Sequence, residues 1–202
     1  MKGRGNKATR KDGFRREILD AARKLFANEG YEKFSMHTLV KRIGHPSATV
    51  DSYFKDKDEL LSALCEEVAE RFFVDLKNIR TVQNDPIECL RQALLYFIGF
   101  GFANPQEYKL LFLTGSQMCV DFDEFMERES MARNAYSAFR EIVTDCIATG
   151  RLLEIDIDVL TQVLAVATRG LALTVHKISF PWVDRNVLAH TLVEGLLRGY
   201  RR

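Results

Sequence analysis

Apolar residues recur at spacings of three and four along most of the chain. The clearest stripes comprise Phe14, Ile18, Ala22, Leu25 and Phe26; Leu61, Leu64, Val68, Phe72, Leu76 and Ile79; and Leu160, Leu164, Ala167, Leu171, Thr174 and Ile178. This spacing places apolar side chains on one face of an α-helix. We find no convincing alternation of apolar and polar residues bounded by turns, which is typical of strands. The pattern therefore predicts an all-α protein.

Capping residues and glycines divide this pattern into segments. Helix starts are indicated at Asp85-Pro86 and Asn104-Pro105, where a capping side chain precedes a proline and a Glu stands three residues after the cap. Helix ends are indicated by glycines that follow apolar stretches, namely Gly30, Gly44 and Gly150. These signals predict about nine helices, over residues 13–29, 36–43, 47–53, 57–81, 86–103, 105–115, 122–149, 157–179 and 184–200.

The two short helices at 36–43 and 47–53 are the most informative feature. Neither is long enough to be stable alone, so both must pack on neighbouring helices. A tight turn at His45-Pro46 separates them. This arrangement is typical of a helix-turn-helix, whose second helix lies in the major groove of DNA. The expected core residues of this small unit are Met36, Leu39, Val40, Ile43, Val50 and Phe54.

These elements indicate two parts. We expect a basic arm and a three-helix helix-turn-helix domain over residues 1–56, which would bind DNA. A C-terminal helical bundle is expected over residues 57–202.

Composition narrows the class of protein. Of the 202 residues, 47% are hydrophobic and 28% are charged, as in ordinary globular chains. No run of about 18 apolar residues is present, so we expect no transmembrane helix and no membrane partner. The basic residues at the start are not followed by an apolar stretch, so we expect no signal peptide and a cytoplasmic location.

The pattern of reactive residues favours neither a metal site nor an enzyme. The cysteines, Cys65, Cys89, Cys119 and Cys146, are widely spaced and form no C-x-x-C pair, and the four histidines form no metal pattern. No G-x-G-x-x-G, G-x-S-x-G, H-E-x-x-H or P-loop pattern is present. We therefore expect no catalytic residues, no metal and no bound cofactor.

Charge is distributed unevenly, although the formal net charge is only +1. Residues 1–57 carry 14 Lys and Arg against 7 Asp and Glu, whereas the remaining residues carry 15 basic and 21 acidic side chains. A basic N-terminal segment on an acidic body is consistent with nucleic-acid binding, although a solvated basic tail has the same composition.

The N-terminal segment resembles the tetracycline-repressor (TetR) family. The similarity covers about residues 14–65 and includes the run from Arg16 to Phe26 with Gly30-Tyr31, then Gly44, Thr49, Tyr53-Phe54 and the run from Lys57 to Leu61. More weakly, the run from Phe102 to Phe112 is similar to an element of the sensor domains in one branch of that family. Arg169 departs from that branch, which often has a His-Gly pair there.

The resemblance implies a set of DNA-binding residues. Ser35 would cap the second helix and, with His37, face phosphate. The exposed face of the recognition helix would present Ser47, Ala48, Thr49, Asp51 and Ser52, followed by Tyr53 beside the DNA backbone and Lys57 at a phosphate. Two positions depart from the family pattern. Pro46 stands where a capping Ser or Thr is common, and Asp51 stands where a Tyr usually contacts phosphate. An Asp there would be repelled by the backbone unless it accepts from a cytosine amino group.

The middle of the chain is rich in aromatic residues, since ten of the twenty Phe and Tyr residues lie between Tyr96 and Phe139. Such a cluster can line an apolar ligand pocket, although core packing explains any single ring better. With the resemblance, it predicts a site for a small apolar or aromatic effector. The candidate lining residues are Phe97, Phe100, Phe112, Met118, Tyr136, Phe139 and Cys146.

The last two predicted helices have the composition of a dimer surface, because small residues permit close helix approach. The candidate residues are Thr174, Val187, Leu188, Leu192, Gly195, Leu196 and Gly199. The resemblance implies a four-helix interface between two copies, and a two-fold homodimer would read a palindromic operator in double-stranded DNA.

The sequence therefore favours a dimeric repressor that is released from its operator by an effector. The alternatives are an enzyme, a helical ligand-binding or partner-binding dimer with a vestigial DNA-binding domain, and an activator. The sign of regulation depends on where the operator lies, so the sequence leaves it open.

Overall fold

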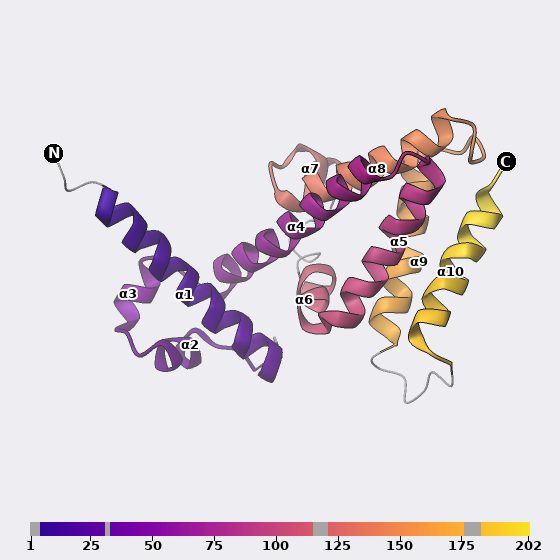
Figure 1. The fold of residues 1–202 in the computed structure, drawn as a ribbon. Helices are drawn as coiled ribbons and strands as arrows, with labels where there is room; N and C mark the ends of the chain where they lie inside the picture. Colours follow the sequence, from indigo (N-terminus) through magenta and orange to yellow (C-terminus); the bar gives the residue numbers. More distant parts are fainter. Residues whose placement is uncertain (1–4, 31–32, 115–120, 176–182) are drawn as a thin grey trace. The chain divides into compact units, whose positions relative to one another are not determined.

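The computed structural model describes residues 5–30, 33–114, 121–175 and 183–202 (Figure 1). Within these ranges the chain is helical, and the only β pairing is an isolated bridge between Leu152 and Arg201. The predicted all-α fold is confirmed. The helices are α1 (Gly5–Glu29), α2 (Met36–Ile43), α3 (Ser47–Asp51), α4 (Lys57–Val82), α5 (Pro86–Ala103), α6 (Pro105–Lys109), the π-helix η1 (Leu110–Thr114), α7 (Phe122–Glu127), α8 (Met131–Ala148), α9 (Ile157–Thr174) and α10 (Arg185–Tyr200).

The chain divides into two compact units, residues 1–66 and residues 67–202. The boundary falls inside α4, whereas the functional division proposed from the sequence places it at the start of that helix. The helix-turn-helix segment lies in the first unit, and the aromatic segment lies in the second.

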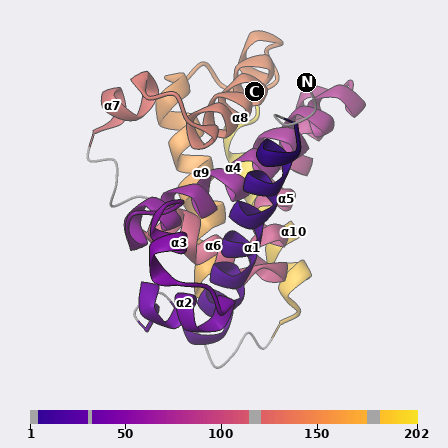
Figure 2. The same cartoon turned by 90° about the vertical axis from the view of Figure 1, so that its left-hand side faces the viewer.

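In the first unit, α2 and α3 lie along one side of α1 (Figure 2). Ser35 caps α2, because its Oγ accepts a hydrogen bond from the Thr38 amide at 3.2 Å. The helix ends at Gly44, whose φ of 75° is a left-handed conformation that glycine adopts without strain. The apolar side chains that face inward are Ile18, Leu19, Ala22, Leu25, Phe26, Phe34, Leu39, Val50 and Phe54. Burial of these side chains holds the two short helices in place.

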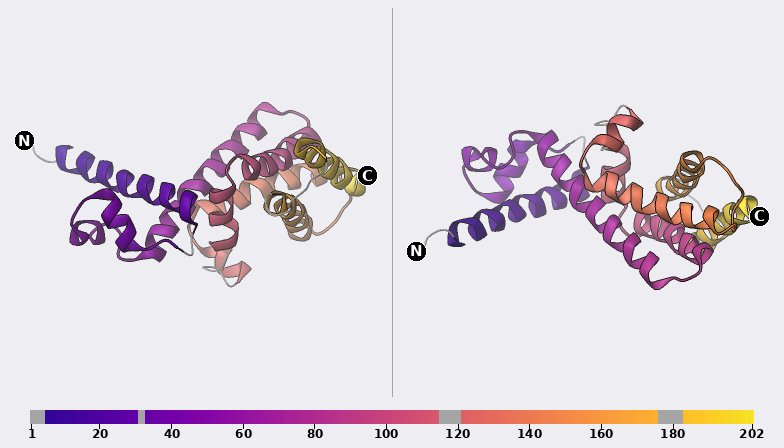
Figure 3. Two further views of the ribbon diagram at one scale, coloured as in Figure 1. Left: turned by 90° about the horizontal axis from the view of Figure 1, so that it is seen from below. Right: turned by 90° about the horizontal axis from the view of Figure 1, so that it is seen from above.

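In the second unit, α5 is the central helix and contacts α8, α9 and α10, the neighbouring helices in Figure 3. Its buried side chains include Leu90, Leu94 and Ile98. Near its end, α5 approaches α9 so closely that a Cβ added at Gly101 would lie 2.7 Å from the Cβ of Ala172. The bundle therefore has one contact that only a glycine permits without movement.

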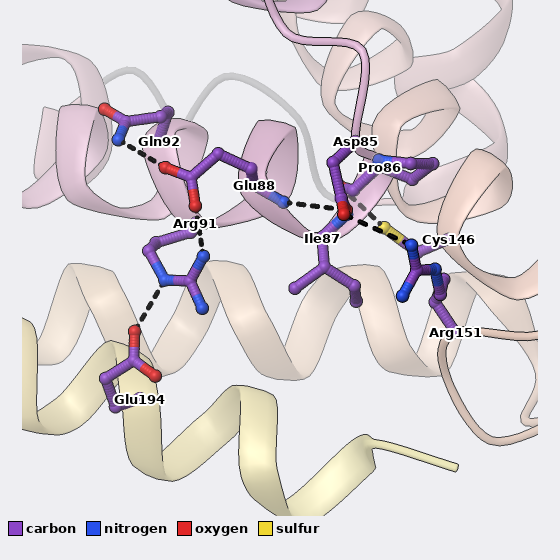
Figure 4. Close-up of polar contacts among 9 residues, drawn as sticks. All are labelled: Asp85, Pro86, Ile87, Glu88, Arg91, Gln92, Cys146, Arg151 and Glu194. Atoms are coloured by element: carbon purple, nitrogen blue, oxygen red, sulfur yellow. Dashed lines mark hydrogen bonds and ion pairs between the residues drawn. The ribbon is translucent and has the colours of Figure 1, made fainter.

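Polar contacts join the first two turns of α5 to α10 and to the segment that follows α8 (Figure 4). Arg91 of α5 pairs with Glu88 on the same helix and with Glu194 of α10, the latter at 2.6 Å. At the start of α5, the Asp85 carboxylate accepts from the Ile87 amide at 2.8 Å and pairs with Arg151 at 3.2 Å. Such exposed pairs contribute only about 0–1 kcal/mol each, so they orient the helices more than they stabilise them.

Several boundaries differ from the predicted ones. The helix predicted over 122–149 is two helices, because Ser130 is extended and caps α8 by accepting from the Arg133 amide at 3.1 Å. The described residues therefore hold ten α-helices rather than nine. The first helix begins at Gly5 rather than at residue 13, and the helix predicted over 105–115 is α6 followed by η1.

Two capping predictions also need correction. Glu88 does not reach back to the start of α5, because it pairs with Arg91 and accepts from Gln92. Asn104 makes no capping hydrogen bond to α6, because its Nδ2 donates to the Phe100 carbonyl at 3.3 Å. The side chain is used at the end of α5 instead.

By length and composition alone, α9 is apolar enough to cross a membrane, which the sequence analysis did not predict. Its inward face, which includes Leu160 and Leu164, belongs to the core of the second unit. Its outward face is also apolar, as described below.

Candidate nucleic-acid interface and effector site

The recognition helix expected from the sequence is α3, which holds five residues. Pro46 is its N-cap, with φ −57° and ψ 140°, and no side chain caps the helix there. Proline therefore occupies the capping position, where the family resemblance leads one to expect a Ser or Thr. The Ser52 Oγ donates to the Thr49 carbonyl at 2.7 Å and closes the last turn.

Only Val50 of α3 is buried, and it anchors the helix in the core of the first unit. The opposite face presents Ser47, Ala48, Asp51 and Ser52, all exposed, with Thr49 half-buried beside them. The structure therefore brings the five predicted base-reading residues together on one short helix.

Aromatic contacts hold both ends of this segment on α1. The ring of Phe14 lies 4.7 Å from that of His45 and 5.2 Å from that of Tyr53, both edge to face. Tyr53 is half-buried, so part of its ring is packed and part faces solvent. The sequence analysis placed Phe14 in the core stripe and did not predict this role, because ring contacts between distant residues leave no local signal.

The predicted phosphate-binding residues on either side of α3 differ in whether their side chains contact other protein groups. The Ser35 hydroxyl caps α2 and also shares a hydrogen bond with Thr38 Oγ1 at 2.8 Å, whereas His37 is exposed. The Lys57 ammonium lies 5.8 Å from the centroid of the Phe34 ring. Asp58 and Glu59 make the first turn of α4 acidic, so the helix dipole at Lys57 is partly neutralised before any phosphate approaches.

Basic residues that the sequence analysis did not single out also lie on this unit. Lys41 and Arg42 are exposed in the last turn of α2, just before the turn that leads to α3. Arg15 and Arg16 are exposed on α1, and the guanidinium of Arg15 lies 5.1 Å from the centroid of the Phe54 ring. The sequence shows an excess of basic residues in this segment, but that excess does not identify which of the side chains lie on the same face of the unit.

In the second unit, aromatic rings gather around Phe72 of α4. Its ring centroid lies 5.2 Å from Phe97, 4.6 Å from Phe100 and 6.0 Å from Phe112. Phe139 joins the group through an edge contact with Phe97 at 5.1 Å. Four predicted effector residues are therefore brought together, around a ring that the sequence analysis had assigned only to the core stripe.

The other predicted effector residues lie elsewhere. Tyr136 packs against Phe122 and Phe125 of α7, at 5.7 and 5.9 Å between ring centroids. The Cys146 thiol donates to the Pro86 carbonyl at 3.0 Å, and burial raises the pKa of this thiol to about 12 (Figure 4). Met118 lies outside the described residues.

Polar groups surround the aromatic cluster. The Tyr96 hydroxyl donates to Asp75 at 2.7 Å, and Arg71 pairs with Glu107 while its guanidinium lies 5.3 Å from the Phe100 centroid. The guanidinium of Arg169, on α9, lies 4.5 Å from the centroid of Phe112.

The predicted dimer residues lie on α9 and α10, and four of the seven are exposed. Thr174, Val187, Gly195 and Gly199 are exposed. Leu188, Leu192 and Leu196 are half-buried, and the latter two pack against the core of the second unit.

An exposed stripe of valines on α9 was not predicted from the sequence. Val159, Val163 and Val166 follow helical spacing and are 38% to 62% exposed. The pattern that could have revealed it is that α9 carries apolar residues on its outward face as well as on the face that packs in the core.

Comparison with known proteins finds a family similarity in the first unit. Residues 18–64 match the family model described as bacterial regulatory proteins, tetR family. An HTH-type transcriptional repressor of Mycobacterium tuberculosis is 44% identical over 57 residues, which are 28% of this chain and 30% of that protein. An HTH-type transcriptional regulator of Staphylococcus aureus is 31% identical over 97 residues, 47% of this chain and 52% of that protein. The matches thus span between about a third and a half of the length of these transcriptional regulators.

A solved structure extends the similarity in fold to most of the chain. A transcriptional regulator of the TetR/AcrR family from Thermobifida fusca aligns with a TM-score of 0.67 over 94% of this chain and 100% of that one, at 22% identity. Both units therefore have the fold of such regulators.

Proposed function

Because residues 18–64 match the model of the tetR family of bacterial regulatory proteins, we propose that the protein is a dimeric transcriptional repressor of that family. It binds a palindromic operator through α3 and is released when a small apolar or aromatic effector binds the second unit. The observation that carries the proposal is the five-residue helix α3, anchored by Val50 with its polar face exposed, inside the segment that matches the family.

Operator recognition is assigned to the exposed face of α3. Ser47, Thr49 and Ser52 carry hydroxyl groups that can donate to or accept from either base of a pair. When ionised, the Asp51 carboxylate accepts hydrogen bonds but donates none. It therefore selects the amino group of a cytosine and disfavours phosphate. Lys41 and Arg42 are exposed beside this helix and supply part of the affinity for phosphate, which depends on salt.

The test is selection of random duplexes on the purified protein at physiological salt, with Asp51→Asn and Asp51→Tyr variants alongside. A palindrome is expected for the wild type. The Asn variant should change the preferred base at one position of each half-site, because an amide favours adenine. If no protein enriches any sequence, operator binding is refuted.

In that case the alternative function applies, a helical ligand-binding or partner-binding dimer with a vestigial DNA-binding domain. The exposed acid of Asp51 and the acidic first turn of α4 are the features that favour it.

Dimerisation is assigned to the outer surface of α9 and α10. Val159, Val163 and Val166 expose apolar surface that a second copy would remove from water. Thr174, Gly195 and Gly199 lack large side chains and allow close helix approach. A two-fold arrangement would present two recognition helices to successive half-sites.

The test is the oligomeric state by analytical ultracentrifugation. Val166→Glu is expected to yield a monomer, because it places a charge in the interface. Val74→Glu is the matched control, since Val74 is also exposed but lies on α4. If Val166→Glu remains a dimer with the wild-type dissociation constant, the interface lies elsewhere.

Release by the effector follows from linkage. A ligand in the second unit lowers operator affinity only by the factor by which it prefers the state that binds DNA poorly. Candidate ligands can therefore be ranked by titration of the operator complex, and a ligand that binds without changing operator affinity is not the effector.

A further inference from the structure

Arg169 of α9 lies against the aromatic part of the second unit. Its guanidinium carbon is 4.5 Å from the centroid of Phe112. The ring of Phe112 in turn lies 4.5 Å from Tyr108 and 6.0 Å from Phe72. The Arg169 Nε is buried and, among the described residues, donates to no acceptor. A ring face attracts the cation, but it does not accept the in-plane N–H of Nε.

Five other arginines of this unit pair with a carboxylate, although their side chains are 23% to 50% exposed. They are Arg71, Arg80, Arg91, Arg140 and Arg151. Carboxylates raise the pKa of Arg91 and Arg140, whereas burial lowers the pKa of Arg169. Within the described ranges, Arg169 therefore combines a buried Nε that makes no hydrogen bond with the lack of a paired acid.

A buried cation without a counter-ion opposes folding, because it loses water and gains no equivalent interaction. If packing against Phe112 were the only role of this position, an apolar side chain would serve it better. An anion that arrives from outside the chain would supply both the charge and the acceptor. Phe112 belongs to the π-helix η1, a geometry that is frequent at functional sites.

We propose that Arg169 binds a carboxylate of the effector, which is a monocarboxylic acid with an apolar or aromatic body. The planar guanidinium donates two parallel hydrogen bonds to a carboxylate, and Nε is one of the two donors in the common geometry. The body packs against Phe100 and Phe112, whose rings are only partly buried, with the buried ring of Phe72 behind them. The inference rests on the proposed function, since it names the class of ligand that the sensing unit recognises.

The test compares acids with neutral molecules of the same shape by isothermal titration calorimetry on the full chain. The pairs are decanoate with decan-1-ol, and 2-naphthoate with 2-naphthalenemethanol, which distinguish an aliphatic from an aromatic body. Wild type is expected to bind one acid at least about tenfold more tightly than its alcohol, as charge-assisted hydrogen bonds imply. In Arg169→Met this preference should vanish while affinity for the alcohol stays within about threefold.

Two controls separate recognition from a structural role. Arg71→Met removes another cation stacked on a ring of the same cluster, but one that already pairs with Glu107, so it should keep the preference for the acid. Without ligand, Arg169→Met should raise the thermal midpoint by about 2–4 °C, because an unpaired buried charge is removed. A lower midpoint would indicate that Arg169 serves the fold.

The proposal is overturned if wild type prefers neither acid, or if Arg169→Met keeps the preference. Operator binding is measured on the same wild-type sample with the duplex selected above. Operator binding without acid preference refutes the inference alone. Acid preference without operator binding refutes the repressor function and leaves the anion site in place.

Discussion

Replacing Gly101 by alanine tests a close contact between α5 and α9 in the second unit. The added Cβ would lie 2.7 Å from Ala172 Cβ and 3.1 Å from Cδ2 of the Tyr108 ring. Carbon atoms that are not bonded prefer a separation of about 3.5–4.0 Å. Because Ala172 Cβ is attached directly to the backbone of α9, it cannot rotate away. The two helices must therefore separate by about 1 Å at this point.

The magnitude follows from two opposing effects. Overpacking a well-packed core costs about 1–3 kcal/mol. Replacing a glycine inside a helix by alanine returns about 0.5–1 kcal/mol, because the unfolded chain loses conformational freedom. We expect a net loss of about 1–2 kcal/mol in the free energy of unfolding. Gly99 is a matched control on the same helix, since a Cβ there meets nothing within 4 Å. Gly99→Ala should stabilise the protein by about 0.5–1 kcal/mol.

The assay is urea unfolding followed by helical circular dichroism. The difference between the two variants isolates the contact, because the chemical change is the same. Adding Ala172→Gly to Gly101→Ala should recover part of the loss, and the double-mutant cycle measures the coupling between the two residues. If Gly101→Ala is as stable as Gly99→Ala, α5 and α9 are not as close as described.

Three further predictions address the cap, an ion pair and the DNA contact. Ser35→Ala should destabilise the first unit by about 1 kcal/mol in urea unfolding, because the Thr38 amide loses its acceptor; an unchanged midpoint would show that the cap is dispensable. The hydrogen bond and charge of Arg140 hold the pKa of Asp158 below its ordinary value. The pair therefore stabilises the fold above about pH 4, and this stabilisation is lost as the pH falls below that value and Asp158 becomes protonated. Asp158→Asn should therefore flatten the decline of the thermal midpoint between about pH 5 and pH 3, and an equal decline in both proteins would contradict the assignment. Lys57→Ala should lower operator affinity at low salt and reduce the slope of log K against log salt by about one, whereas an unchanged slope would exclude a phosphate contact.

Local signals predicted the elements well where one backbone interaction decided them. Asp85 caps α5 as expected, and Gly44 ends α2 in the left-handed conformation. The capping prediction was wrong at Asn104. This residue also precedes a proline, but its side chain donates to the Phe100 carbonyl of the previous helix and does not cap the next one. Local signals also missed the start of α8 at Ser130, because a serine within a polar segment is compatible with both a helix and a break.

The candidate sites were predictable to different degrees. The exposed face of α3 follows from one buried residue, Val50, together with helical periodicity. The aromatic cluster was predicted in outline, but Phe72 was missed and Tyr136 lies against α7 instead. The valine stripe that includes Val166 also required knowledge of which face of α9 the core covers.

The helical class, most helix ends and the helix-turn-helix segment could be predicted from the sequence. These depend on hydrogen bonds and caps between residues up to four positions apart, so the information is local. Only the tertiary structure decided that Gly101 meets Ala172, that Phe72 is at the centre of the rings and that Arg169 has no acid beside it within the described residues. Each of these results from how helices far apart in the sequence cross. The crossing is set by the packing of many side chains at once, and no single residue specifies it.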